Sequence, residues 1–268
     1  MTQQDSSRLP RRTVLGLAGL GAAALSSCSP GSSTRAGKET QPPGETPAYG
    51  SPTADPSPAS TSATGPANGS DITHGPRTSQ EVALTFHGAG DPLLVDRLIA
   101  LTRAQASHVT VLAVGQWAAA NPDVLPRLVD AGHEVGNHTW SHRTMTRLSQ
   151  GQLQHETDRA ASELKRQVGD VGAWFRPSGT PRSTPMIRAA AQRAGYPRCL
   201  AYDVDSLDYT DPGPTAIVRT VSARVRRGSI VSLHLGHAGT MTALPALLDM
   251  LRRRGLRAVT AGELLAGS

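Results

Sequence analysis

The sequence predicts one α/β domain, most simply a small or distorted parallel (β/α) barrel, behind a long N-terminal segment that stays unfolded. Three observations support this. After residue 78, short β-branched or apolar runs alternate with helical ones. Ionisable residues directly follow several of these runs, and before residue 78 small and turn-forming residues dominate. A doubly wound parallel sheet is the alternative arrangement of the same elements.

The elements follow one another regularly from residue 82 onward. The first strand, 82–86, reads VALTF, and the second, 109–114, reads VTVLAV; the amphipathic stretch 92–105 lies between them as a helix. The long helix 150–168 places Leu153, Ala160, Leu164 and Val168 on one face. Further strands are expected at 133–137, 173–175, 199–204, 229–233 and 256–259, and further helices at 122–131, 183–194, 214–226, 241–254 and from Ala261.

The N-terminus reads as an export signal. Arg11 and Arg12 precede an apolar run, 14–25, that is too short to cross a bilayer of about 20 residues' thickness. The arginine pair resembles a twin-arginine signal, and the LSSC sequence ending at Cys28 resembles a bacterial lipobox. We therefore expect residues 1–28 to direct export and Cys28 to carry lipid, with ordinary secretion as the alternative.

Residues 29–77 are expected to form a disordered linker. The segment consists of Ser, Thr, Pro, Gly and Ala with almost no large apolar residues, so burial cannot offset the entropy of ordering it. It would hold the folded domain, 78–268, away from a membrane anchor.

Composition excludes several classes of protein. Hydrophobic residues make up 38% of the chain and aromatic residues 3%, which fits neither a multi-span membrane protein nor an aromatic nucleic-acid platform. The formal net charge of +6 arises after residue 76, mostly from arginines spread over several segments. We interpret it as a basic surface and expect no nucleic-acid partner. The 2 cysteines cannot build a disulfide framework, and Cys199 is expected to be a buried thiol.

Ionisable residues stand at the ends of five expected strands. They are His87, His138, Arg176, Asp205 and His234. Parallel barrels carry their active sites at the carboxyl ends of the strands. The sequence thus predicts that imidazoles, a carboxylate and a guanidinium surround one mouth.

The segment HTWSH points to a metal. It spaces His138 and His142 four residues apart, and neutral imidazole is a good ligand for zinc or a similar divalent ion. A surface or capping pair would have the same spacing. The position at a strand end favours the metal.

Several segments, in this order, resemble the motifs of the polysaccharide deacetylase family of the NodB-homology type, carbohydrate esterase family four. The resemblance runs from about Glu81 to Leu265. The segments that carry it are VALTF at 82–86, HTWSH at 138–142, FRPSG at 175–179, DVDSLDY at 203–209 and IVSLH at 230–234. It implies a distorted (β/α) barrel that deacetylates glycans with the help of a divalent metal.

The resemblance also implies roles for single residues. His138 and His142 would hold the metal, Arg176 would orient the catalytic base, Asp205 would partner the catalytic histidine, and His234 would be the general acid. A further group, expected to contact the substrate along the groove, is Trp140, Pro177 and Tyr209. Packing around the mouth is the alternative role for the aromatic residues of the motifs.

The first motif departs from the family pattern. Where the family carries two aspartates, a base and a third metal ligand, this chain has His87 and Gly88. His87 is a candidate base or third imidazole ligand. Asp91 is the only carboxylate nearby, and it is either a metal ligand or base or a cap on the helix that Pro92 begins. We favour Asp91 as the metal ligand and His87 as the base, with the reverse assignment open.

Two functions from different classes fit these observations. The first is an exported, lipid-anchored hydrolase that uses a divalent metal, zinc by its ligands, to deacetylate an N- or O-acetylated envelope polysaccharide such as peptidoglycan or a chitin-like glycan. The second is a silent carbohydrate-binding module on the same fold. Loss of the aspartate pair favours the module. Retention of both zinc-type histidines with Arg176, Asp205 and His234 favours the enzyme.

Overall fold

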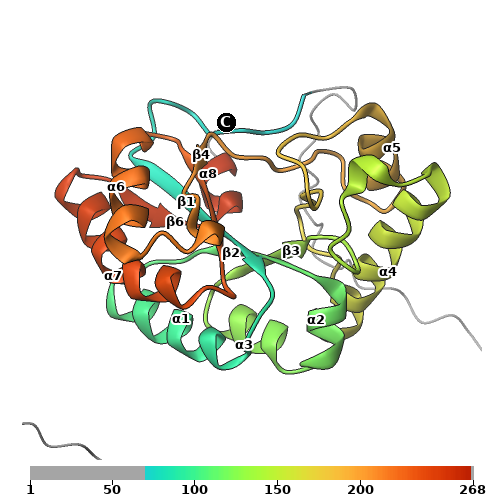
Figure 1. Cartoon of the computed structure of the whole chain (residues 1–268), viewed down its shortest axis with the longest axis horizontal. Coiled ribbons are helices and arrows are strands. Elements are labelled where there is room, and N and C mark those ends of the chain that lie inside the picture. The colour runs from blue at the N-terminus through green and yellow to red at the C-terminus, as the bar shows by residue number, and fades with distance from the viewer. Residues whose placement is uncertain (1–69, 267–268) are drawn as a thin grey trace, which may run out of the picture. The chain divides into compact units, whose positions relative to one another are not determined.

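The expected alternation of strands and helices is confirmed in the computed structural model, which describes residues 70–266 (Figure 1). The export signal, Cys28 and the linker as far as residue 69 lie outside the described residues. In chain order the elements are β1 (Glu81–Gly88), α1 (Leu93–Ala104), β2 (Thr110–Ala113), α2 (Gly115–Ala120), α3 (Val124–Asp130), β3 (Glu134–Asn137), η1 (Met145–Arg147), α4 (Gln150–Val168), α5 (Pro185–Arg193), β4 (Val204–Asp205), η2 (Asp208–Thr210), α6 (Pro214–Arg224), β5 (Ile230–His234), α7 (Ala238–Arg253), β6 (Arg257–Val259) and α8 (Ala261–Ala266).

The strands form a parallel sheet that nearly closes on itself. Its order is β3-β2-β1-β5-β4, and β6 pairs with the first half of β1. Beyond β3 the ring continues through single bridges, from Asn137 to Phe175 and from Phe175 to Cys199. The segment of Cys199 then runs on into β4, which pairs with β5. This closure makes the fold a distorted barrel and excludes the doubly wound sheet.

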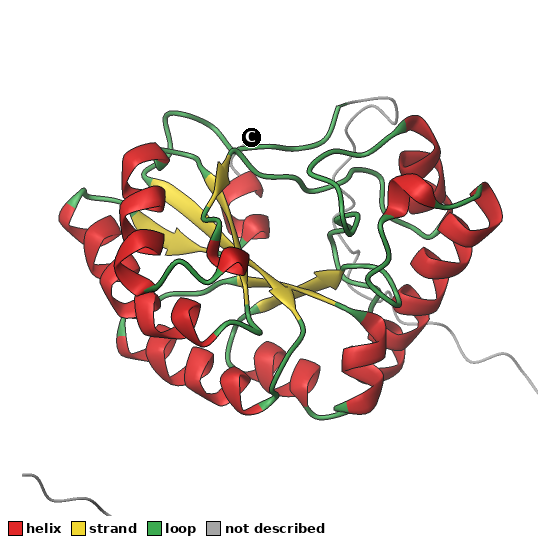
Figure 2. Cartoon of the chain, viewed as in Figure 1, coloured by secondary structure: helices red, strands yellow, loops and turns green. Residues whose placement is uncertain are grey.

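The two least regular strands of the barrel are those expected at 173–175 and 199–204. Only Phe175 of 173–175 forms a bridge, and of 199–204 only Cys199, Leu200 and Val204 pair with neighbours. The short helix α2 was not expected. Figure 2 shows the helices outside the strands, with long loops on the side where these weak strands lie.

The domain begins earlier than the sequence predicted. Ile72 is buried, donates its N–H to Cys199 O at 2.9 Å and accepts from Ala201 N at 2.7 Å. His74 forms a bridge with Ser229. This arm, residues 71–75, lies against the weak strand at 199–204, so the boundary at residue 78 was wrong. The signal for this earlier start in the sequence was Ile72, an apolar residue in a stretch of small and polar ones.

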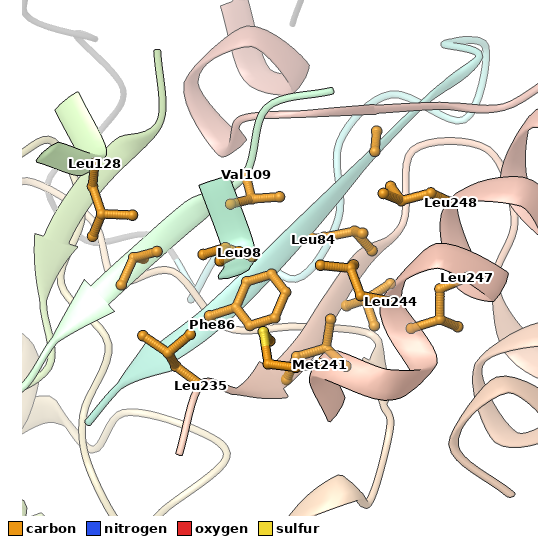
Figure 3. Close-up of a cluster of buried hydrophobic side chains, with 14 of the residues drawn as sticks. Leu84, Phe86, Leu98, Val109, Leu128, Leu235, Met241, Leu244, Leu247 and Leu248 are labelled. Carbon is orange, nitrogen blue, oxygen red and sulfur yellow. The ribbon is translucent and has the colours of Figure 1, made fainter. Parts of the chain in front are cut away.

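The two faces of each strand pack into different layers. Outward-facing Leu84 and Phe86 of β1 contact α1 and α7 in the main hydrophobic cluster (Figure 3). Inward-facing Ala83 belongs with Leu112 and Ile230 to a smaller cluster that fills the barrel. The alternation follows from the two-residue period of a strand.

This period and the register bring the site together. β1 and β5 pair in parallel with Ala83 opposite Ile230, so His87 falls opposite His234. Both residues lie an even number of positions from an inward-facing one and therefore also face the interior. The two imidazoles meet at the carboxyl end of the barrel, with ring centroids 4.3 Å apart. None of the helices within 70–266 meets the length and hydropathy of a membrane span.

Candidate metal and acid–base site

Three histidines converge at the mouth of the barrel. His87 is the second-last residue of β1, and His138 and His142 lie in the loop after β3. One nitrogen atom from each ring lies within 4.8 Å of those of the other two. The strand ends therefore bring together a cluster of three potential ligands, as the sequence predicted for His138 and His142.

His138 is built to offer one nitrogen. It is fully buried, and its Nδ1 lies 2.8 Å from the carbonyl oxygen of Arg176, which only accepts, so Nδ1 carries the proton. Its Nε2 is buried and has no hydrogen-bond partner. An orphaned, buried lone pair next to a second imidazole is the arrangement that a divalent cation satisfies.

The surroundings keep all three rings neutral, the form that binds metal. Burial lowers the pKa of His138, and the neighbouring His142 lowers it further. Burial and then His234 lower the pKa of His142. For His87, burial is followed by His138, Arg176, His234 and His142, which together hold its pKa well below the usual range.

His87 differs from the other two because a cation faces it. Arg176 Nη1 lies 3.3 Å from His87 Nε2, and a guanidinium only donates, so Nε2 is the acceptor and the proton of the ring is on Nδ1. Binding a metal through Nε2 would displace Arg176 directly. Binding it through Nδ1 would move the ring proton to Nε2, which could then no longer accept from Arg176. His138 and His142 meet no such competition and are the better pair of ligands.

Arg176 is buried at 2% exposure and anchored to the backbone. Its Nε donates to Leu200 O at 2.9 Å and its Nη2 to Ala201 O at 3.0 Å. Burial lowers its pKa to about 9, so it remains charged at neutral pH. Its place beside position 87 is the one expected for a residue that orients the group there.

A histidine–carboxylate pair stands beside the cluster, but with a different aspartate from the one expected. Asp208, fully buried, accepts from His234 Nδ1 at 2.7 Å, from His234 N at 2.7 Å and from Thr240 Oγ1 at 2.6 Å. Burial would raise the pKa of Asp208, but these hydrogen bonds outweigh it and hold the pKa below its usual value.

Asp205, which was expected to be this partner, has another task. Its Oδ1 accepts from Leu207 N at 3.0 Å, and Leu207 takes the left-handed conformation with φ 59°. The resulting turn places the carboxylate of Asp208 within hydrogen-bonding distance of His234. The assignment to Asp205 was wrong because this turn is not visible in the spacing of the two aspartates.

Asp91 does not belong to the histidine cluster. It is exposed, and its Oδ1 accepts from Leu93 N at 3.0 Å, at the start of α1. Among residues 70–266, the group that could hold a metal comprises His87, His138 and His142 and not Asp91. The assignment of Asp91 as a ligand was wrong. The expected position at N-cap was wrong by one residue, because Pro92 is the N-cap residue of α1 and Asp91 precedes it, accepting from Leu93 N.

Two of the three expected substrate contacts are buried in the wall of the site. Trp140 is 9% exposed, with the guanidinium carbon of Arg159 3.9 Å from its ring centroid. Pro177 is also buried. Tyr209 is 47% exposed and its ring centroid lies 5.3 Å from that of His234. Only Tyr209 therefore has a free face for a sugar.

The barrel leaves no room for a second carboxylate at position 88. A Cβ added to Gly88 would lie 2.8 Å from Val111 Cγ1 and 3.1 Å from the Cα of Ala113. Both atoms belong to β2. Val111 Cγ1 is a methyl group of a fully buried side chain that turns only about χ1, and the Cα of Ala113 is backbone, so neither moves aside easily. The departure in the first motif therefore includes the packing of the neighbouring strand.

The comparisons with known proteins agree with this architecture. The profile of the family described as polysaccharide deacetylase matches residues 74–198. A peptidoglycan-N-acetylglucosamine deacetylase of Bacillus cereus is 29% identical over 194 residues, which cover 71% of this chain and 90% of that protein.

Solved structures give the same result. A family 4 carbohydrate esterase from Streptomyces lividans, in complex with acetate, is 31% identical with a TM-score of 0.62, covering 66% of this chain and 91% of that one. A pseudoenzyme of the same esterase family from Bacillus anthracis shares the fold at 23% identity and a TM-score of 0.68, covering 72% of this chain and 68% of the other.

Proposed function

The chain belongs to the polysaccharide deacetylase family, carbohydrate esterase family four, and from this premise we propose that it is a metal-dependent hydrolase that removes acetyl groups from a cell-envelope polysaccharide. Peptidoglycan or a chitin-like glycan is the substrate class. The peptidoglycan-N-acetylglucosamine deacetylase that covers most of the domain supports this choice.

One observation carries the proposal: the orphaned Nε2 of His138 lies in a cluster of imidazoles that also adjoins the His234–Asp208 pair. A carbohydrate-binding surface has no use for a buried, unsatisfied ring nitrogen beside a histidine held by a carboxylate. A hydrolytic site needs both.

His138 and His142 would hold the cation, zinc by the chemistry of these ligands, with His87 as the third ring at the site. The cation would supply electrophilic polarisation of the acyl group and a lowered pKa of water. Asp208 accepts from Nδ1 of His234 and so leaves Nε2 to deliver a proton to the departing nitrogen or oxygen. Arg176 fixes the ring of His87, and Tyr209 offers a face for a sugar ring.

Binding without turnover is the second candidate function. It is favoured by the absence of a carboxylate at positions 87 and 88 and by the remote role of Asp91 at α1. With His87 engaged by Arg176, the site lacks an evident general base. The similarity in fold to a pseudoenzyme is in keeping with this possibility.

The test combines metal content with turnover. The double variant His138→Gln, His142→Gln should lose bound zinc and the release of acetate from acetylated chito-oligosaccharides and peptidoglycan fragments, because Gln is a poor zinc ligand. The matched control is His108→Gln, His155→Gln, which changes two exposed histidines away from the cluster. Full metal content in the first variant would contradict the assignment of ligands. Metal without turnover in the unmodified protein would favour the binding function.

We also propose that the domain works outside the cell membrane, anchored through lipid on Cys28. The proposal rests on the sequence of residues 11–28. Replacing Cys28 by Ala should move the protein from the membrane fraction to the medium. Unchanged fractionation would contradict the anchor.

A further inference from the structure

A polar groove adjoins the histidine cluster on one side. It has a volume of about 370 Å³ and is lined by His142, Arg143, Thr144, Arg147 and Leu148. These residues come from the loop after β3 and from η1. His142 belongs both to the groove and to the proposed metal site, so a ligand in the groove lies directly next to the reacting centre.

The two arginines of the groove have no anionic partner in the described part of the chain. Both are exposed, and neither guanidinium makes a hydrogen bond or an ion pair there. Elsewhere on the surface, Arg127 pairs with Asp96 and Arg166 with Glu163. None of the five lining residues is acidic.

The backbone beneath these arginines is firmly held. Ser178 Oγ donates to the carbonyl oxygen of Arg143 at 2.5 Å, and Met145 N donates to Ser178 O at 3.1 Å. The side chain of Met145 is fully buried and anchors η1. Binding an anion would therefore order the two unpaired guanidiniums but would cost little backbone entropy.

The carboxylates around the mouth are engaged by other groups. Glu156 accepts from Ser141 N at 2.8 Å and from Ser141 Oγ at 2.6 Å. Asp205 ends β4, and its Oδ1 accepts from Leu207 N. Asp208 is engaged by His234, and Asp211 by His237 at 2.8 Å. None of these carboxylates forms an ion pair with Arg143 or Arg147, so the two arginines have no ion-pair partner among the described residues.

We propose that this groove, the Arg143/Arg147 groove, is a subsite for an anionic group, carboxylate or phosphate, carried by the glycan beside the acetylated sugar. The assignment rests on the proposed glycan substrate and narrows it to an anionic glycan. Arginine binds carboxylate and phosphate oxygens through paired N–H donors, which a neutral sugar hydroxyl cannot match in charge.

The experiment measures binding and does not depend on turnover. Calorimetric titrations compare neutral N-acetylchitotetraose with a tetrasaccharide of alternating N-acetylglucosamine and N-acetylmuramic acid, whose lactyl groups are carboxylates. A glycerol phosphate trimer, added as a competitor, distinguishes phosphate from carboxylate. Each titration is repeated at low and high salt.

Arg143→Gln, Arg147→Gln should weaken binding of the anionic tetrasaccharide about tenfold, with less than a twofold effect on the neutral one. High salt should weaken the anionic ligand in the unmodified protein and much less in this variant. Arg143→Lys, Arg147→Lys should retain most of the affinity. The matched control, Arg97→Gln, Arg103→Gln, removes two exposed charges from α1 and should leave both affinities unchanged. Neither guanidinium of the groove makes a hydrogen bond or an ion pair in the described residues, and both side chains are exposed, so the variants should fold normally.

These measurements distinguish failure of the anionic subsite from failure of the proposed glycan function. Equal affinity of the unmodified protein for both tetrasaccharides, or an equal loss for both in the Gln variant, would overturn the anionic subsite and leave the glycan function intact. Binding of neither tetrasaccharide would overturn the glycan function and the subsite with it. Effective competition by the glycerol phosphate trimer would assign the subsite to phosphate, and its failure to compete would assign it to carboxylate.

Discussion

His87 and His234 occupy paired positions on neighbouring strands and face the same interior, yet their partners have opposite charge. His234 Nδ1 donates to the buried carboxylate of Asp208, whereas His87 Nε2 accepts from the buried guanidinium of Arg176. The carboxylate orients His234 by accepting from its Nδ1. The guanidinium opposes protonation of His87. Two identical side chains in one register thus differ in the chemistry they can perform.

The comparison separates the retained part of the site from the altered part. The β5 side keeps a histidine that can exchange a proton, supported by Asp208 and Thr240. The β1 side keeps Arg176 but presents a neutral ring to it, and Val111 and Ala113 fill the space beside Gly88. Arg176 therefore faces a neutral acceptor where the family pattern has a carboxylate.

The largest expected effect is on the β5 side. His234→Asn should lower kcat for acetate release by about 10²–10⁴-fold, the usual contribution of a general acid, because Asn cannot supply a proton at neutral pH. Metal content should not change, since His138 and His142 are intact. Turnover equal to that of the unmodified protein would refute the role of His234.

The reverse change is expected on the β1 side. His87→Asp places a carboxylate before Arg176, where the guanidinium favours its ionised form, so kcat should rise about 10²-fold, toward the lower end of what a general base contributes. His87→Asn is the control of similar size without charge, and it should give no gain. Should the unmodified protein lack turnover, the His234→Asn test is done in the His87→Asp background. No gain with Asp would show that the base is not what limits the site.

The smallest expected effect concerns His133, a buried imidazole away from the mouth of the barrel. It tests the same principle, that the surroundings of a histidine decide which form of the ring is favoured. His133 Nδ1 accepts from Val109 N at 3.3 Å, and Nε2 lies 3.1 Å from Thr102 Oγ1, so the neutral ring is satisfied. Burial, and then the nearby His108, lower its pKa to about 4.

Because the folded pKa lies below that of the unfolded chain, the stabilisation is complete above pH 6.5 and declines as the pH falls toward 4. We expect the free energy of unfolding to drop by about 1–2 kcal/mol between pH 7 and pH 5 from this residue. Urea titrations of the unmodified chain and of His133→Gln at both pH values measure the difference. An equal pH dependence in the two proteins would contradict the assignment.

Most strands and the main helices could be predicted from the sequence, because the apolar runs follow the periods of strand and helix. The predictions failed where single tertiary contacts replaced a pattern. Ile72 joins the barrel through backbone contacts with Cys199 and Ala201 that no local repeat encodes. Trp140 reads as a sugar platform in sequence but is buried against Arg159.

The sequence by itself determined the alternating α/β order, the place of the site at the strand ends and the identity of its histidines. These follow from local periodicity and from chemistry at fixed spacings. Only the tertiary structure decided that Asp208 and not Asp205 supports His234, that Asp91 accepts from Leu93 N at the start of α1, and that His87 accepts from Arg176. The reason is physical: each of these outcomes depends on a turn or on a register between strands far apart in the chain, where a displacement of one residue exchanges the partners.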